Sequence, residues 1–211
     1  MVSRETLLTK YFSATSDSTA QIERYEEILK TWGIERGLIG PREGEIIWER
    51  HILNCLPVLS AIKEGSTLID IGSGAGLPGI VLAISRPDLK VTLLEPLERR
   101  VRFLNEVIGE LGIDCQVVQS KAENWKSTSY QVVTARAVAN TAKLFGMVKH
   151  LIAPQGALLA LKGESAELEL VEAKKNNVNL FRGWNAMVQV VELEGLEKAN
   201  LLRITRSNPL L

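Results

Sequence analysis

The sequence predicts an α/β protein with a doubly wound, mostly parallel sheet that follows a helical segment. From residue 66 onward, short apolar runs of strand length alternate with longer amphipathic segments. This alternation is typical of a parallel sheet covered by helices on both faces. Residues 1–62 show helical periodicity instead. We therefore expect an N-terminal helical cap over residues 1–62 and an α/β core over residues 63–211.

The composition is that of an ordinary soluble globular protein, with 45% hydrophobic and 24% charged residues. Lys plus Arg and Asp plus Glu each number 25, so the formal net charge is zero. This balance argues against a constitutively basic nucleic-acid binder and leaves a local basic face open. No apolar run reaches the roughly 18–20 residues that span a bilayer, and no signal-peptide core is visible. Cys55 and Cys115 lack metal-ligand spacing. We expect a cytoplasmic protein without metal or membrane attachment.

Two helices are expected in the cap. The first spans residues 19–32 and carries an apolar stripe at three- and four-residue spacing: Ile22, Tyr25, Ile28, Leu29 and Trp32. Gly33 and Pro41 lie in a glycine-containing stretch that ends this pattern. The second helix spans residues 42–62, with a kink or split expected at Pro57 because proline has no amide hydrogen.

The core segments follow in regular order. Five parallel strands are expected over residues 66–72, 89–96, 115–120, 130–138 and 156–163. Helices are expected over residues 78–85, 97–112, 140–153 and 164–176. Two further β-rich runs, residues 186–193 and 200–206, are separated by a turn-like segment, so we expect an antiparallel pair at one edge of the sheet.

The stretch LIDIGSGAGLPGIVLAI, residues 68–84, holds four glycines in eight positions. Glycine costs backbone entropy on folding, so such a cluster indicates that a ligand approaches the main chain closely. The loop follows the first expected strand. In doubly wound sheets, ligands bind beyond the carboxyl ends of the strands, where strand order reverses. The loop is therefore the candidate ligand site.

The glycine spacing favours one ligand over another. A dinucleotide fingerprint, G-x-G-x-x-G, would need a third glycine at the position of Leu77. The chain instead has G-x-G-x-G two residues after Asp70, which is typical of class I methyltransferases that bind S-adenosylmethionine. Glu95 ends the second strand, where both cofactor types use a carboxylate for ribose hydroxyls, so it does not separate them.

Further motifs make the pattern specific. GSGAGLPG, LLEPLERRVRFL, the late ARA and LALKGE, together with TWGIERGLIGPRE and RHILNC, resemble the bacterial and plastid small-subunit ribosomal RNA methyltransferase G family, also called glucose-inhibited division protein B. The resemblance covers most of the chain. It implies a class I methyltransferase Rossmann-like fold and methylation of N7 of a guanosine in 16S rRNA with S-adenosylmethionine.

The resemblance also implies a set of cofactor contacts, carried over position by position: Asp70, Gly72, Gly74, Gly76, Leu77, Glu95, Ala122, Glu123 and Arg136. Asp70 and Glu95 would bracket the methionine amine and the ribose, and Ala122 and Glu123 would flank the adenine. Arg136 is the arginine of the ARA motif. The family usually has N-L-T where this chain has Gly37-Leu38-Ile39, and aspartate at Asn54. Those departures bear on substrate positioning.

The expected reaction requires the reactants to be positioned and does not require a general base. Guanine N7 carries an in-plane lone pair, so no proton has to leave before it attacks the sulfonium methyl. We expect Arg136 to act by positioning, as a hydrogen-bond donor to cofactor or guanine, or else to pair with Glu123. His51 is expected to be packed or solvent-facing. Lys162 is expected to meet an RNA phosphate or solvent.

Three other classes stay open at this point: an NAD-dependent oxidoreductase, a small-molecule methyltransferase, and a non-catalytic RNA-binding module. Leu77 disfavours the first, and the intact Asp70, glycine loop and Glu95 disfavour the third. Substrate choice depends on the cap and the late loops, so the glycine loop alone does not exclude a small-molecule methyltransferase. The expected partner is 16S rRNA within the small ribosomal subunit or an assembly intermediate, and a monomer is expected.

Overall fold

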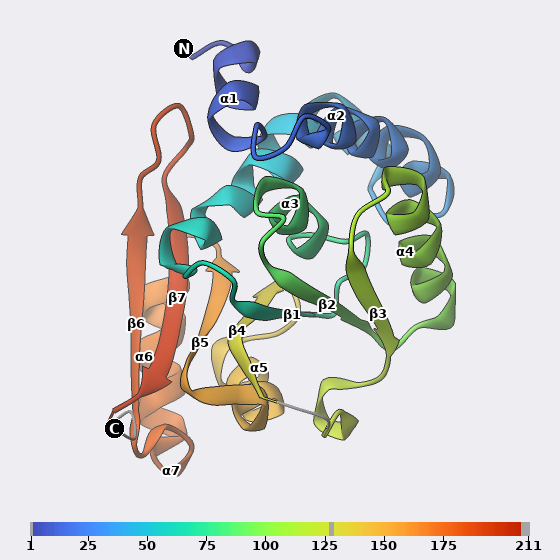
Figure 1. Cartoon of the computed structure of the whole chain (residues 1–211). Coiled ribbons are helices and arrows are strands. Elements are labelled where there is room, and N and C mark those ends of the chain that lie inside the picture. The colour runs from blue at the N-terminus through green and yellow to red at the C-terminus, as the bar shows by residue number, and fades with distance from the viewer. Residues whose placement is uncertain (1, 127–128, 208–211) are drawn as a thin grey trace.

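The computed structural model describes residues 2–126 and 129–207. Seven strands form one sheet in the order β3-β2-β1-β4-β5-β7-β6 (Figure 1). Their bounds are β1 Thr67–Ile71, β2 Lys90–Glu95, β3 Cys115–Gln119, β4 Tyr130–Arg136, β5 Ile152–Lys162, β6 Trp184–Val191 and β7 Ala199–Arg206. The first five strands pair in parallel, and β7 runs antiparallel to both β5 and β6. The predicted doubly wound sheet with an antiparallel C-terminal edge is confirmed.

Helices cover both faces of this sheet. Their bounds are α1 Arg4–Tyr11, α2 Ser18–Ile28, α3 Gly79–Ser85, α4 Glu98–Leu111, α5 Thr141–Val148, α6 Ala166–Asn176 and α7 Val178–Phe181. Neighbouring residues of a strand serve opposite faces: Leu68 joins the apolar cluster under α2, α3 and α4, and Ile69 joins the cluster under α5, α6 and α7. Successive side chains of a strand point to opposite faces of the sheet, and both faces are buried. This explains why the strands are continuous apolar runs in the sequence.

The cap departs from the two expected helices. Helix α2 continues into a π-helical turn, η1 (Leu29–Gly33), and the expected helix over 42–62 is a series of short turns instead. These are the 3₁₀ segment η2 (Pro41–Ile46), the π-helical η3 (Ile47–Ile52) and the 3₁₀ segment η4 (Leu53–Ala61). Pro57 lies inside η4, where it removes a backbone donor. Helices α1 and α7 were not predicted.

The cap and the sheet share one apolar cluster, which contains Ile22 of α2, Leu56 of η4 and Leu159 of β5. Polar contacts join the same parts. The Tyr11 hydroxyl donates to the carbonyl of Glu194 in the β6–β7 loop at 2.9 Å. Figure 1 shows the cap along the upper end of the sheet, beside the tip of the β6–β7 hairpin. The division of the chain at residue 62 stays a prediction.

In the described part of the chain, no helix has the length and apolar character needed to cross a bilayer.

The contact between α3 and the sheet leads to a stability prediction. A Cβ added at Gly79 would lie 2.8 Å from Asp70 Oδ2 and against the Leu93 side chain. Both neighbours are buried, so Gly79→Ala should lower the free energy of unfolding by about 1–3 kcal/mol through overpacking. Urea denaturation measures this change.

Gly109→Ala is the matched control. Gly109 lies within α4, and an added Cβ there meets nothing within 4 Å. Alanine in an exposed helix interior should raise stability by roughly 0.5–1 kcal/mol. Equal effects of the two substitutions would contradict the close packing at Gly79.

Candidate functional site

The glycine loop joins β1 to α3 at the carboxyl edge of the sheet, as predicted. Gly72, Gly74 and Gly76 have φ of +64°, +57° and +99°, a region that residues with a Cβ rarely adopt. A Cβ on Gly72 would lie 3.2 Å from Val138 Cγ2, and one on Gly76 would lie 3.0 Å from the Tyr25 hydroxyl. The glycines therefore allow other parts of the protein to pack closely against the loop.

The cap holds this loop directly. Tyr25 of α2 is fully buried, and its hydroxyl donates to the carbonyl oxygen of Ala75 at 2.8 Å. Tyr25 was predicted only as part of an apolar stripe. A tyrosine within such a stripe signals a buried hydroxyl that needs a partner, but the sequence does not identify that partner.

Asp70, the penultimate residue of β1, is fully buried. Its Oδ2 accepts a hydrogen bond from the amide of Gly79, the first residue of α3, at 3.1 Å. Its Oδ1 is buried and has no partner among the described residues. Burial raises the pKa of this carboxyl to about 7, although the Gly79 amide and the Arg136 charge act in the opposite direction. An unpartnered carboxylate oxygen at this strand end fits a cationic ligand group.

Glu95 ends β2 and is also buried. Its Oε2 accepts from the Gly74 amide and its Oε1 from the Leu97 amide, each at 3.0 Å. Arg100 of α4 lies 3.8 Å away through Nη1. The carboxylate therefore fixes the glycine loop and the start of α4.

The other predicted cofactor residues lie around these carboxylates. Leu77 is partly buried against the apolar cluster of the cap. Ala122 is buried and Glu123 is exposed, both in the short 3₁₀ turn η5 (Ala122–Asn124) after β3. The carboxyl ends of β1, β2, β3 and β4 lie side by side, which brings these residues to one edge of the sheet.

Arg136, at the end of β4, lines a cavity of about 420 Å³. Of the predicted cofactor residues, it alone lines this cavity. Its Nη1 donates to the carbonyl of His51 at 2.9 Å, and its Nη2 donates to His51 Nδ1 at 2.8 Å and to the carbonyl of Arg50 at 3.2 Å. The alternative pairing with Glu123 is not present among the described ion pairs.

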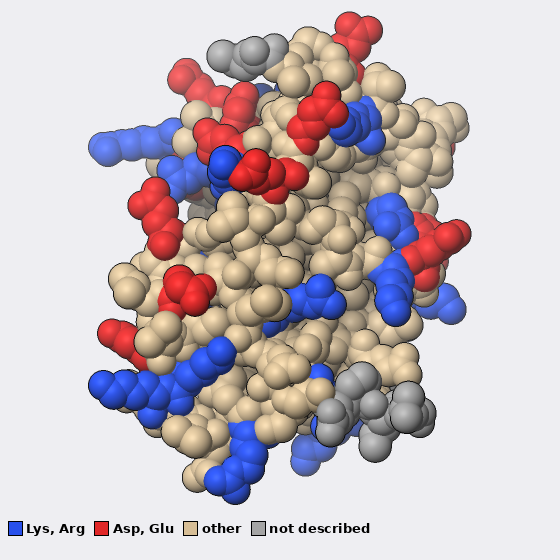
Figure 2. Space-filling model, turned by 90° about the vertical axis from the view of Figure 1, so that its left-hand side faces the viewer, with Lys and Arg blue, Asp and Glu red and all other residues tan. Residues whose placement is uncertain are grey.

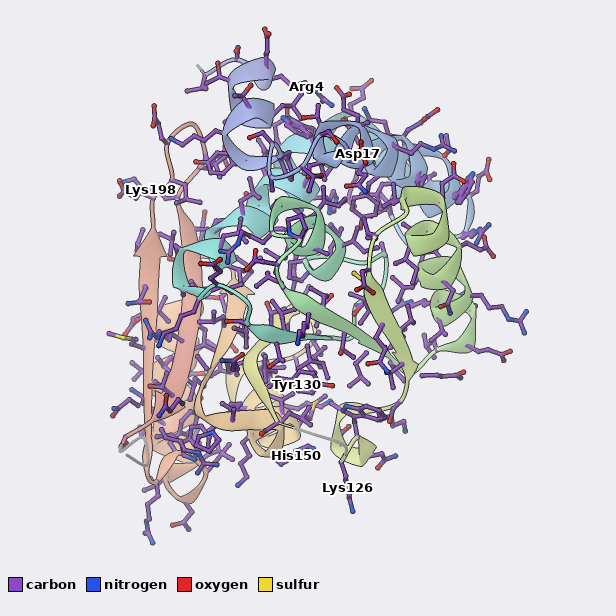
Figure 3. The ribbon with its side chains drawn as sticks, in the orientation of Figure 1. Arg4, Asp17, Lys126, Tyr130, His150 and Lys198 are labelled. Carbon is purple, nitrogen blue, oxygen red and sulfur yellow. The ribbon has the colours of Figure 1, made fainter. Side chains whose placement is uncertain are left out.

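Several parts of the chain wall the cavity. Arg50 and Asn54 come from the cap, residues 135–139 and 160–164 from the ends of β4 and β5, Leu144 from α5, and residues 197–200 from the end of the β6–β7 loop and the start of β7. Figure 3 shows Lys198 of this loop at the cap end of the molecule, with Tyr130, His150 and Lys126 at the opposite end. The cavity thus lies at the carboxyl ends of β4 and β5.

Two residues of the cavity differ from expectation. Lys162 is paired within the protein: its Nζ donates to the carbonyl of Ala139 at 3.0 Å and to Glu169 Oε1 at 2.8 Å. Ala137 has φ of +54°, and a non-glycine residue in this region marks a backbone held under strain, as is common at functional sites. Nothing in the sequence signals that strain.

The departures from the family pattern fall into two groups. Gly37 has φ of +67° in a turn, and Ile39 is buried against Gly33, so both serve the packing of the cap. Asn54 lines the cavity, with its Nδ2 donating to the Arg50 carbonyl at 3.1 Å. Of these three positions, only Asn54 lines the cavity.

His51 was expected to be packed or solvent-facing, and it is buried. Its bond to Arg136 was missed, because the two residues are 85 positions apart. Among the described residues no three of His, Cys, Asp and Glu cluster as metal ligands. The candidate site combines buried carboxylates, main-chain amides and one guanidinium.

The raised pKa of Asp70 makes stability depend on pH. The folded carboxyl has a pKa of about 7 against an ordinary 3.8, so between these values the folded state holds more protons. Its contribution to stability is therefore full at low pH and is lost as the pH rises through 7. Asp70→Asn stays neutral and can still accept from Gly79. It should be roughly 2–4 kcal/mol more stable than the parent at about pH 8, with little difference near pH 4.

Asp88→Asn is the control of opposite sign. Arg86 lowers the pKa of the Asp88 carboxyl to about 2, so its stabilisation is present above the ordinary pKa and lost in acid. This variant should be less stable than the parent at about pH 8. Denaturation of the parent and both variants at both pH values measures the differences in stability. If both variants differed from the parent in the same direction at about pH 8, the assignment at Asp70 would be refuted.

Comparison with solved structures agrees with the fold. A methyltransferase from Pyrococcus furiosus superposes with a TM-score of 0.60 at 16% identity, over 90% of this chain and 98% of that one. A ribosomal protein L11 methylase from Lactobacillus delbrueckii subsp. bulgaricus superposes with a TM-score of 0.56 at 14% identity, over 74% and 77%. These structures have low identity, and they show the fold alone.

Sequence comparison is more specific. Proteins named ribosomal RNA small subunit methyltransferase G include one from Thermobifida fusca, 54% identical over 72% of this chain and 65% of that protein. Another, from Frankia alni, is 42% identical over 90% of this chain and 75% of that protein. The sequence model of the family described as rRNA small subunit methyltransferase G matches residues 18–194. The resemblance found in the motifs is confirmed, and the chain belongs to this family.

Proposed function

We propose that this protein transfers a methyl group from S-adenosylmethionine to N7 of a guanosine in 16S rRNA. Family membership supports the class of reaction. The structural observation that carries the proposal is the cavity of about 420 Å³ beside the glycine loop, with Arg136 in its wall. The cavity lies at the carboxyl edge of the sheet, where this architecture binds its ligands.

The residues at the strand ends would hold the cofactor. Asp70 Oδ1 would accept from the methionine ammonium, and Glu95 would accept from the ribose hydroxyls while it holds the Gly74 amide. The main chain around Gly72 and Leu77, and the Ala122–Glu123 pair, complete the proposed set. When bound, S-adenosylmethionine supplies an electrophilic methyl on a sulfonium.

The cavity would receive the guanine. Arg50, Asn54 and Asn200 line it with donors and acceptors that can bind the edge of a base. A base inside a folded RNA has to be unpaired or turned out of its stack to enter such a pocket. The protein must then hold N7 in line with the methyl carbon and the sulfur, and such positioning supplies several kcal/mol of the barrier.

No general base is needed for the proposed reaction. His51 is the histidine nearest the cavity wall, and its Nδ1 already accepts from Arg136. Arg136 is a donor only, so it would orient cofactor or guanine through hydrogen bonds rather than remove a proton. We assign it the positioning role in catalysis.

The substrate is proposed to be a ribosomal particle rather than free RNA. The formal net charge is zero, and on the face over β6 in Figure 2 Asp and Glu gather mainly in the upper half, whereas Lys and Arg predominate in the lower half. Phosphate contacts supply most of the non-specific affinity for RNA, and they scale with the number of basic groups. In a particle, ribosomal proteins would present the target helix, so fewer basic groups on the enzyme would be needed to bind the RNA. We propose a cytoplasmic monomer acting on the small subunit or an assembly intermediate.

A methyl-transfer assay tests the reaction. Labelled S-adenosylmethionine should label 16S rRNA in small subunits from cells that lack this protein, and chemistry selective for 7-methylguanosine should cleave at the label. Arg136→Ala should reduce the rate at least about 100-fold, the usual effect of removing one charged donor at a reacting centre. Lys126→Ala, at the opposite end of the molecule in Figure 3, should leave the rate unchanged. Label in a small metabolite and none in RNA would refute the proposal.

Cofactor binding gives a separate prediction. Glu95→Gln removes the charge that holds the glycine loop, so its affinity for S-adenosylmethionine should fall by about 10-fold to 100-fold, the value of one charged hydrogen bond. Glu98→Gln, an exposed neighbour on α4, should bind as the parent does. Calorimetric titration of both variants measures the affinities. Unchanged binding by Glu95→Gln would remove Glu95 from the cofactor site.

A further inference from the structure

We propose that His51 is a positioning residue for methyl transfer: from the cap, it holds the guanidinium of Arg136 in the orientation that lines the cavity. The proposal rests on the proposed function, because it assigns His51 a part in that reaction. His51 is buried, and its ring lies between Arg136 of β4 and Glu43 of η2.

The hydrogen bonds determine which ring nitrogen carries the proton. Arg136 Nη2 lies 2.8 Å from His51 Nδ1, and a guanidinium can only donate, so Nδ1 must offer its lone pair. The proton is then on Nε2, which lies 3.2 Å from Glu43 Oε2 and donates to it. Glu43 therefore sets the tautomer that Arg136 requires, as a carboxylate does for other functional histidines.

The same segment supplies the remaining contacts of the guanidinium. Arg136 Nη1 donates to the carbonyl of His51, and Nη2 donates also to the carbonyl of Arg50. Both carbonyls belong to the π-helical turn η3, a form of helix that recurs at functional sites. In the described part of the chain no carboxylate pairs with Arg136. Its charge is thus held in place by neutral acceptors and is not neutralised.

The surroundings keep the imidazole neutral. The titratable groups that face it are Glu43 of η2, Arg50 of its own turn, Arg136 of β4 and the Cys55 thiol of η4, which donates to the His51 carbonyl at 2.9 Å. Burial and the Arg136 charge lower the pKa of His51, and Glu43 acts against them. A proton on Nδ1 would point at the guanidinium, so the neutral ring and the positioned arginine require each other.

The consequence for the reaction is preorganisation. Arginine has a long, flexible side chain. If this donor has to be ordered during the reaction, the reaction is slower. His51 removes that freedom before substrate arrives. Loss of the Nδ1 acceptor should therefore lower kcat, by about 5-fold to 50-fold for one hydrogen bond to a charged group, with a smaller change in KM.

Two substitutions separate the two ring nitrogens. His51→Asn places an acceptor near the position of Nδ1 and loses the contact with Glu43. His51→Gln reaches toward Glu43 and leaves nothing at Nδ1. We expect His51→Asn to retain most of kcat and His51→Gln to lose it, at equal melting temperature. A purely structural role would make the two variants rank by stability instead.

A double-mutant cycle shows whether His51 acts through Arg136. The loss caused by His51→Gln should disappear in the Arg136→Ala background, because the residue that His51 positions is absent. Additive losses would overturn the proposal. A wild-type protein that methylates no RNA would overturn the proposed function, and with it this role in the reaction.

Nitrogen NMR of the imidazoles tests the contact without any assay of activity. The chain has two histidines, and His150 lies far from the cavity. In the His150→Gln variant the only imidazole signals are therefore those of His51. We expect an unprotonated Nδ1 and a protonated Nε2, with the Nδ1 signal shifted by Arg136→Ala. A protonated Nδ1, or a signal indifferent to Arg136, would overturn the positioning contact even if methyl transfer is confirmed.

Discussion

The buried carboxylate of Asp70 is the group on which the geometry of the site depends. One of its oxygens binds the first amide of α3, and this contact fixes how the chain leaves β1 and enters the helix. The other oxygen is buried without a partner among the described residues. Burial of this oxygen without a partner raises the pKa of the carboxyl and costs stability. Such a group favours the binding of a cationic ligand group over an empty site.

The parallel sheet brings the remaining groups to the same edge. Glu95 ends the neighbouring strand and ties the glycine loop to it, while Arg136 ends the strand on the other side of β1. The cap closes over that edge at two points, through Tyr25 onto the loop and through His51 onto Arg136. The glycine loop and the cavity wall are thus both contacted by the cap, which also shares an apolar cluster with the sheet.

Local patterns predicted the core better than the cap. The expected strands and helices after residue 66 are present, and the antiparallel pair at the edge is confirmed. The helix expected over 42–62 is wrong in type, because Pro57 and the contacts to Arg136 favour short 3₁₀ and π-helical turns over a continuous α-helix. The positions of Asp70 and Glu95 near strand ends were predicted, because strand ends and glycine spacing are contiguous signals. Lys162 was misread, since its partner Glu169 lies on a helix that packs against it only after folding.

The sequence by itself determined the family, the class of sheet and the residues at the glycine loop, because each of these depends on short motifs and on the periodicity of neighbouring side chains. Only the tertiary structure decided how the site is held. The Arg136–His51 bond joins residues 85 positions apart, and the left-handed backbone of Ala137 has no local signal. Such contacts depend on the packing of the cap against the sheet edge, and no periodicity within either segment encodes that packing.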